Sequence, residues 1–185
     1  MLKRSKTDKN AATSEDEVIY RSNRVLVVDD NEDAGRLLGK IVRRAGYEVA
    51  EMGDHQVAIA TLVNETQPVG AVIASFTTTG TGACLRLLDA IRSHTEPKIC
   101  ELRVMLVSDQ PRQQIFCLQA GADAIMLRPY HSTDLLDELS TMIERPDEDR
   151  MPYRRRTIEL LKRTTTHDLD PTIPSPREVS AAHFS

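Results

Sequence analysis

Five polar residues stand at or directly after the ends of short apolar runs, where their side chains could act together on a charged group. They are Asp29, Asp30, Ser75, Ser108 and Arg128. Two adjacent carboxylates can hold a hard cation such as Mg²⁺, which prefers oxygen ligands and keeps several of its waters. A hydroxyl can hydrogen-bond a phosphoryl oxygen, and a basic side chain can balance its charge. The set therefore contains parts of a site for Mg²⁺ and phosphoryl chemistry.

The segments that would position these residues alternate between apolar and amphipathic runs. The apolar runs predict strands at residues 24–28, 47–51, 71–75, 104–107 and 124–127. The amphipathic runs predict helices at residues 31–45, 57–64, 83–92, 111–120 and 133–143. This alternation predicts an α/β fold, a five-stranded parallel doubly wound sheet covered on both faces. Ligand sites in such sheets lie outside the carboxyl ends of the strands, so the five side chains should be neighbours.

Composition limits the classes of function. The chain has 185 residues, enough for one domain of ordinary size plus tails, and 40% of them are hydrophobic. A net charge of −4 favours neither nucleic acid nor a membrane as an obligatory partner. No apolar run approaches the roughly 20 residues that span a bilayer. The N-terminus lacks the apolar stretch of a signal peptide, so we expect a cytoplasmic protein.

The pattern predicts one domain between two tails. Residues 1–23 are polar and without periodicity, and we expect them to be disordered. Residues 24–145 carry the domain. Residues 146–185 are first basic and then proline-rich, and we expect them to be mostly disordered. The alternative for the basic stretch is a short amphipathic helix that binds a partner or an anionic surface.

Three segments resemble a bacterial response-regulator receiver domain, a flavodoxin-like fold. Residues 24–30 read as a strand ending in paired acids, and residues 106–108 as a strand ending in a hydroxyl. Residues 120–130 read as a turn, a strand and then a basic residue, proline and an aromatic residue. The resemblance covers about residues 24–145. It implies a non-enzymatic signalling domain in a phosphorelay, or two-component system, that works through protein partners.

The resemblance also assigns a role to each position, and several positions depart from the family. Asp29 and Asp30 match its acid pair, and Ser108 matches its hydroxyl residue. Ser75 stands where the family has the aspartate that takes a phosphoryl group from a histidine kinase. Arg128 stands where it has lysine. Serine cannot form an acyl phosphate, and a planar guanidinium does not replace a compact ammonium neutrally.

These departures favour a stand-alone pseudo-receiver that acts by protein–protein interaction without aspartyl phosphorylation. Ile125, where many receivers have a switch aromatic, supports this interpretation. No cofactor is required, and Asp29 and Asp30 should bind Mg²⁺ only weakly. The expected partner is a histidine kinase, another regulator or an effector, on the face of the fourth helix, fifth strand and fifth helix. Two alternatives remain: the protein could form a homodimer, and it could be a functional phospho-receiver with an unusual acceptor.

A polar loop supports a further alternative, a domain that binds a small molecule or nucleotide. The loop is Thr77, Thr78, Thr79, Gly80, Thr81 and Gly82. It follows a strand and precedes a helix, so hydroxyls, N–H groups and a helix N-terminus could form an anion site. The competing interpretation is a polar loop without a ligand.

The histidines show no spacing typical of metal ligands, and we expect ordinary surface residues at all of them. They are His55, His94, His131, His167 and His183. The sequence also contains no nucleophile–histidine–acid set with motif support, so we expect no enzymatic activity.

Overall fold

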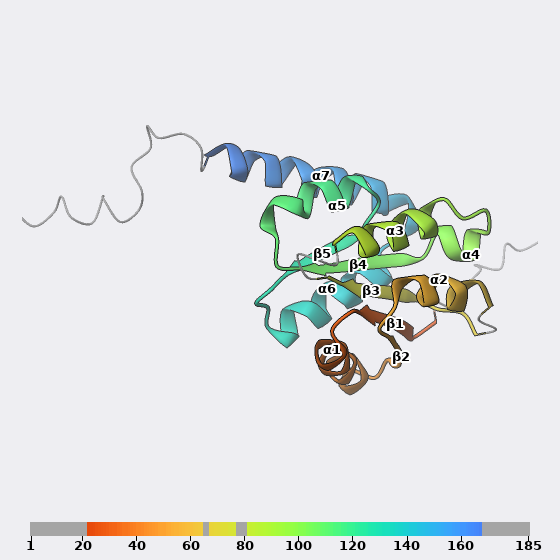
Figure 1. Ribbon diagram of the computed structural model, residues 1–185. Helices are drawn as coiled ribbons and strands as arrows, with labels where there is room; N and C mark the ends of the chain where they lie inside the picture. Colours follow the sequence, from red (N-terminus) through yellow and green to blue (C-terminus); the bar gives the residue numbers. More distant parts are fainter. Residues whose placement is uncertain (1–21, 65–66, 77–80, 168–185) are drawn as a thin grey trace, which may run out of the picture.

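A computed structural model describes residues 22–64, 67–76 and 81–167 of the chain. In this part, parallel strands form one five-stranded sheet with the order β2-β1-β3-β4-β5. Figure 1 shows helices on both of its faces, so the predicted α/β fold is confirmed. The strands are β1 (Arg24–Asp29), β2 (Glu48–Met52), β3 (Ala71–Ser75), β4 (Arg103–Ser108) and β5 (Ala124–Leu127).

The predicted helices are present, with small shifts at their ends. The helical elements are α1 (Glu32–Arg44), α2 (His55–Asn64), α3 (Thr81–Arg92), α4 (Pro97–Cys100), η1 (Pro111–Gln113), α5 (Gln114–Gln119), α6 (Ser132–Glu144) and α7 (Asp147–His167). The short α4 was not predicted, because four residues with Pro97 in the first turn carry no periodicity. None of the described helices is long and apolar enough to cross a membrane.

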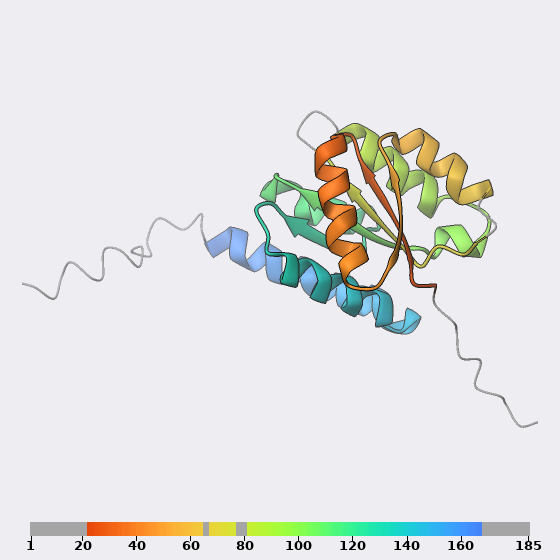
Figure 2. The same ribbon diagram turned by 90° about the horizontal axis from the view of Figure 1, so that it is seen from below.

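The strands divide the core into two layers because successive side chains point to opposite faces of the sheet. Leu26 and Val28 of β1 belong to the cluster that packs against α2 and α3. Val25 and Val27 belong to the cluster that packs against α1 and α6. Figure 2 shows these helices on their two sides of the sheet. Burial on both faces explains why β1 reads as a continuous apolar run.

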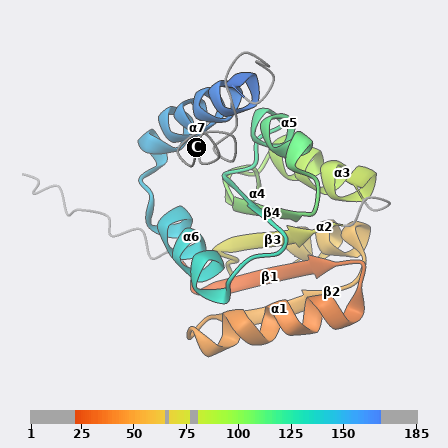
Figure 3. The ribbon, with the colours of Figure 1, turned by 90° about the vertical axis from the view of Figure 1, so that its left-hand side faces the viewer.

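The helix α7 corrects the predicted tail. Residues 146–185 were expected to be mostly disordered, which is wrong for the segment up to His167. Figures 1 and 3 show α7 lying along α5, and its Tyr153 contacts Glu138 of α6. The sequence of this segment has little apolar periodicity, and for that reason no helix was predicted here. Ion pairs between side chains help to hold the helix in place. The rest of both predicted tails, residues 1–21 and 168–185, lies outside the described residues.

Candidate functional site

Two of the predicted site residues face each other at the carboxyl edge of the sheet. β1 and β3 are neighbours in parallel register, and Asp29 pairs with Ser75. Asp29 is 2% exposed and Ser75 is fully buried. On the other side of β3, Ser75 pairs with Val107, so Ser108 stands one residue beyond it. The edge therefore brings together residues that are far apart in the sequence, as expected of a doubly wound sheet.

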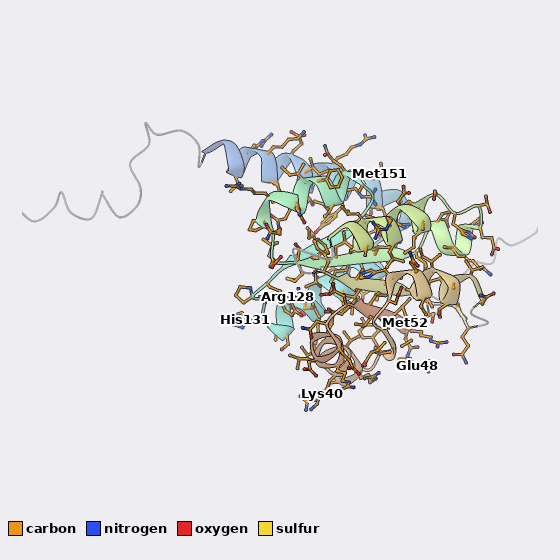
Figure 4. All side chains as sticks on the ribbon, in the orientation of Figure 1. Lys40, Glu48, Met52, Arg128, His131 and Met151 are labelled. Atoms are coloured by element: carbon orange, nitrogen blue, oxygen red, sulfur yellow. The ribbon has the colours of Figure 1, made fainter. Side chains whose placement is uncertain are left out.

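Arg128 connects this edge through its guanidinium group. Its Nη2 donates to the hydroxyl of Ser75 and lies 3.3 Å from Oδ2 of Asp29. Its Nη1 lies 3.4 Å from the carbonyl oxygen of Phe76. Its main-chain N–H donates to the carbonyl oxygen of Ser108 at 2.8 Å. This bond holds the backbone of Arg128 beside the end of β4. Figure 4 shows Arg128 at this edge of the molecule, where its charge offsets that of Asp29.

The acid pair is divided between two environments, and the residues present do not complete a magnesium site. Oδ1 of Asp29 accepts the N–H of Asn31 at 2.9 Å, while its Oδ2 faces Arg128. Asp30 is exposed. Among the described residues, no group of three His, Cys, Asp or Glu side chains could hold a metal ion. Because Mg²⁺ gives up its waters reluctantly, one ion-paired and one free carboxylate make a poor ligand set.

The other predicted site residues make few contacts with Asp29, Ser75 and Arg128. Ser108 is fully buried, and its hydroxyl accepts the N–H of Gln110 at 3.0 Å. Ile125 is half-buried and packs against the core on the α2 and α3 side. In the threonine and glycine loop, residues 77–80 lie outside the described residues. Thr81 and Gly82 are not loop residues, because α3 begins two residues earlier than predicted.

His55 is a functional candidate that the sequence did not reveal. The expectation of a surface histidine is wrong here, because the side chain is only 5% exposed. Asp54 accepts the N–H groups of Gln56 and Val57 and so caps α2 directly before His55. Asp54, as a helix-capping residue, was the signal in the sequence that α2 begins at His55. Of the other histidines, His94 is half-buried and His131 is exposed, while the side chains of His167 and His183 lie outside the described residues.

The surroundings of His55 keep it neutral near physiological pH. Burial lowers its pKa below the ordinary 6.5, and the charges of Asp30, Asp54 and Asp29 only partly oppose this. Its Nε2 is buried without a hydrogen-bond partner. Together with Asp30, Asp54 and Arg86, the ring lines a cavity of about 370 Å³ beside the acid pair.

Replacing His55 with glutamine should make stability less dependent on pH below 6.5. Because the folded-state pKa is lowered from 6.5, the unfolded chain binds a proton there that the folded protein does not. Stability from the neutral ring is fully present above pH 6.5 and is lost as the pH falls through the lower folded-state pKa. Urea unfolding at a series of pH values measures this, with His131→Gln as the exposed control. An unchanged pH slope would contradict the argument.

Comparison with known proteins agrees with this architecture. No protein-family model matches the sequence, and neither does any of the curated proteins compared with it. Solved structures do match. The chemotaxis response regulator CheY4 of Vibrio cholerae is 20% identical, with a TM-score of 0.55 over 65% of this chain and 98% of that chain. The fold is that of response-regulator receivers.

Further solved structures match the chain to a similar extent. A response regulator from Thermotoga maritima is 19% identical, with a TM-score of 0.55 over 67% of this chain and 99% of its own. A sensor protein from Polaromonas sp. JS666 is 18% identical, with a TM-score of 0.57 over 65% of this chain and 95% of its own. Identities this low establish the receiver fold alone, so the roles of individual residues rest on the geometry described above.

Proposed function

We propose that the protein is an atypical receiver that acts in phosphorelay-type signalling by protein–protein interaction, without aspartyl phosphorylation. The observation that carries this proposal is the hydrogen-bonded set of Asp29, Ser75 and Arg128 at the carboxyl edge of the sheet. A receiver needs a free carboxylate at this edge to accept a phosphoryl group. Here the buried side chain beside Asp29 is the hydroxyl of Ser75, and the guanidinium of Arg128 donates a hydrogen bond to it.

The charges of the set also favour a single state. Arg128 supplies internally the positive charge that a metal ion would bring to Asp29. Ser75 cannot form the labile acyl phosphate whose charge would attract the Ser108 hydroxyl. A ligand shifts a conformational equilibrium only through its different affinities for the two states. Without an acyl phosphate, this edge has no such source of differential free energy, so the domain works through constitutive contacts.

Incubation with acetyl phosphate and Mg²⁺ should leave the purified protein unphosphorylated. The physical reason is the missing carboxylate at Ser75. Intact-mass spectrometry checks this, with a phosphorylatable receiver treated in parallel to show that the donor is active. A phosphoryl adduct on an aspartate, which hydroxylamine removes, would contradict the proposal, because an acyl phosphate reacts with hydroxylamine and a serine phosphate ester does not.

The partner is proposed to be a protein, and the face of α5, β5 and α6 is the one that receivers commonly present. In this chain α7 lies along α5, and Tyr153 bonds Glu138 of α6 at 3.3 Å. A partner for that face must therefore bind beside α7 or replace it.

A further inference from the structure

A buried carboxylate directly before β5 holds α7 on the domain. Asp123 is 3% exposed, and guanidinium groups of three arginines bind it. Arg92 of α3 lies 2.8 Å from Oδ2. From α7, Arg150 bonds Oδ2 at 2.9 Å and Oδ1 at 3.0 Å, and Arg154 bonds Oδ1 at 3.1 Å. The N–H of Val104 completes the set at 2.9 Å from Oδ2.

Main-chain carbonyl groups around Asp123 accept further N–H groups of the two α7 arginines, whereas Nε of Arg154 is buried without a hydrogen-bond partner. Arg150 donates to the carbonyls of Glu101 at 2.8 Å and Leu102 at 3.2 Å. Arg154 donates to the carbonyl of Gly121 at 3.1 Å. We call the Asp123 carboxylate and these three carbonyl groups the Asp123 socket. Every acceptor in the socket belongs to the domain and every donor from α7 is a guanidinium, so the socket is built for arginine.

The spacing of the two donors suits a helix. Arg150 and Arg154 are four residues apart, so they project from the same face of α7 about one turn apart. A guanidinium is a planar fork that can reach a carboxylate and a carbonyl at once, which a lysine ammonium does less well. The next arginines in sequence, Arg155 and Arg156, are exposed and make no contact with the socket.

Apolar burial contributes only in part to this attachment, since Tyr153, Ile158 and Leu161 of α7 are half-buried. No described residue of α7 belongs to either core cluster, and Met151 and Leu160 are more than half exposed. Two further contacts hold its first half: Arg103 bonds Asp147 at 2.6 Å, and Arg145 stacks over the Tyr153 ring at 3.4 Å. Segments with few buried apolar contacts have the lowest opening free energies in a fold. The buried contacts that hold the helix are therefore largely matched charges, which another molecule can supply.

We propose that the Asp123 socket and the adjoining surface of α5 bind a partner helix that carries two arginines one turn apart, and that α7 is the resident occupant. The partner replaces α7 by offering the same guanidinium pair. This inference rests on the proposed role as an interaction module and names the chemistry of the partner. It does not depend on whether Ser75 takes the place of the phosphoacceptor.

A peptide of residues 147–167 tests the site when added to the full-length protein. Fluorescence anisotropy with the labelled peptide should show binding to the Arg150→Ala/Arg154→Ala protein, in which the resident arginines are gone. The unmodified protein should bind it about tenfold more weakly or worse, because its own α7 competes at high effective concentration. Adding Asp123→Asn to the double variant should abolish binding, and so should replacing both peptide arginines with lysine.

Controls separate a failed site from a misfolded protein. Arg155→Ala/Arg156→Ala removes two exposed arginines of the same helix and should bind the peptide as weakly as the unmodified chain. Circular dichroism and thermal melting establish that each variant is folded, and Arg150→Lys/Arg154→Lys replaces the alanine pair if that variant is not. The lysine pair should also open the socket, because it lacks the planar fork.

Two results of these experiments would overturn the proposal. A folded double variant that fails to bind the peptide, or that binds it no better than the unmodified chain does, overturns the proposal. A stable dimer of the unmodified protein in light scattering, abolished by Asp123→Asn, also overturns it, since a second copy would then fill the socket. Because acetyl phosphate labelling does not involve the socket, a failure of the proposed function is recognised separately.

Discussion

Replacing Asp123 with alanine should lower the free energy of unfolding by about 3–5 kcal/mol, the usual loss when one partner of a buried ion pair is removed. The change leaves Arg92, Arg150 and Arg154 largely buried without their shared carboxylate. It also leaves the N–H of Val104 without its acceptor. Urea unfolding followed by circular dichroism measures the difference. Asp89→Ala, an exposed aspartate on α3, should change stability by less than about 0.5 kcal/mol.

Acid should weaken the same attachment in the unmodified protein. Burial alone would raise the pKa of Asp123, but the Arg150 hydrogen bond and the charges of Arg92 and Arg150 hold it below the ordinary 3.8. For a carboxyl group shifted in this direction, the stabilisation is present above pH 3.8 and is lost as the pH falls through the folded-state pKa. A loss that began well above pH 3.8 would point to another group as the cause.

Mg²⁺ should bind the unmodified protein in the millimolar range or worse, and the Ser75→Asp/Arg128→Lys variant should bind it at least about tenfold more tightly, or by about 1.4 kcal/mol. The first change adds a third carboxylate beside Asp29. The second removes the fork that now bonds both Asp29 and Ser75. Isothermal titration calorimetry measures both affinities.

The matched control for the added charge is Ser93→Asp. Ser93 follows α3 at the opposite edge of the sheet, and it is exposed. An additional carboxylate there should leave Mg²⁺ affinity unchanged. Micromolar affinity in the unmodified protein would contradict the argument, because it would require a ligand set that Asp29 and Asp30 alone do not provide.

Most of the sheet could be predicted from the sequence because β1, β3 and β4 are buried on both faces and read as apolar runs. β2 and β5 are only partly buried or exposed, and they were recognised by their place in the alternation of strands and helices. The bounds of β3 and β5 match the prediction, and β1 differs only by including Asp29. The meeting of Asp29, Ser75 and Arg128 also followed, since it requires only that parallel strands end at one edge. What the pattern did not reveal is that Arg128 turns its side chain into the edge and bonds both partners.

The features that were missed depend on contacts between distant parts of the chain. α7 contains Pro152 and a run of arginines, and neither is typical of a helix that packs on a core. Its acidic first turn, Asp147 to Asp149, is a helix-start signal, and the spacing of Arg150 and Arg154 marks one face. Neither signal identifies Asp123 as the group that binds them. His55 was missed for a similar reason, because its burial depends on how Asp54 starts α2.

The position of Asp123 also fixes the order in which the molecule assembles. Arg92 lies 31 residues before it and Arg150 lies 27 residues after it, so the carboxylate joins two long loops. Closing such loops opposes early formation, and the socket exists only after β4 and β5 have paired. Docking of α7 is therefore a late event. Contacts that form after the folding barrier change the rate of unfolding rather than the rate of folding. Weakening the attachment of α7 should therefore speed unfolding and leave the rate of folding nearly unchanged.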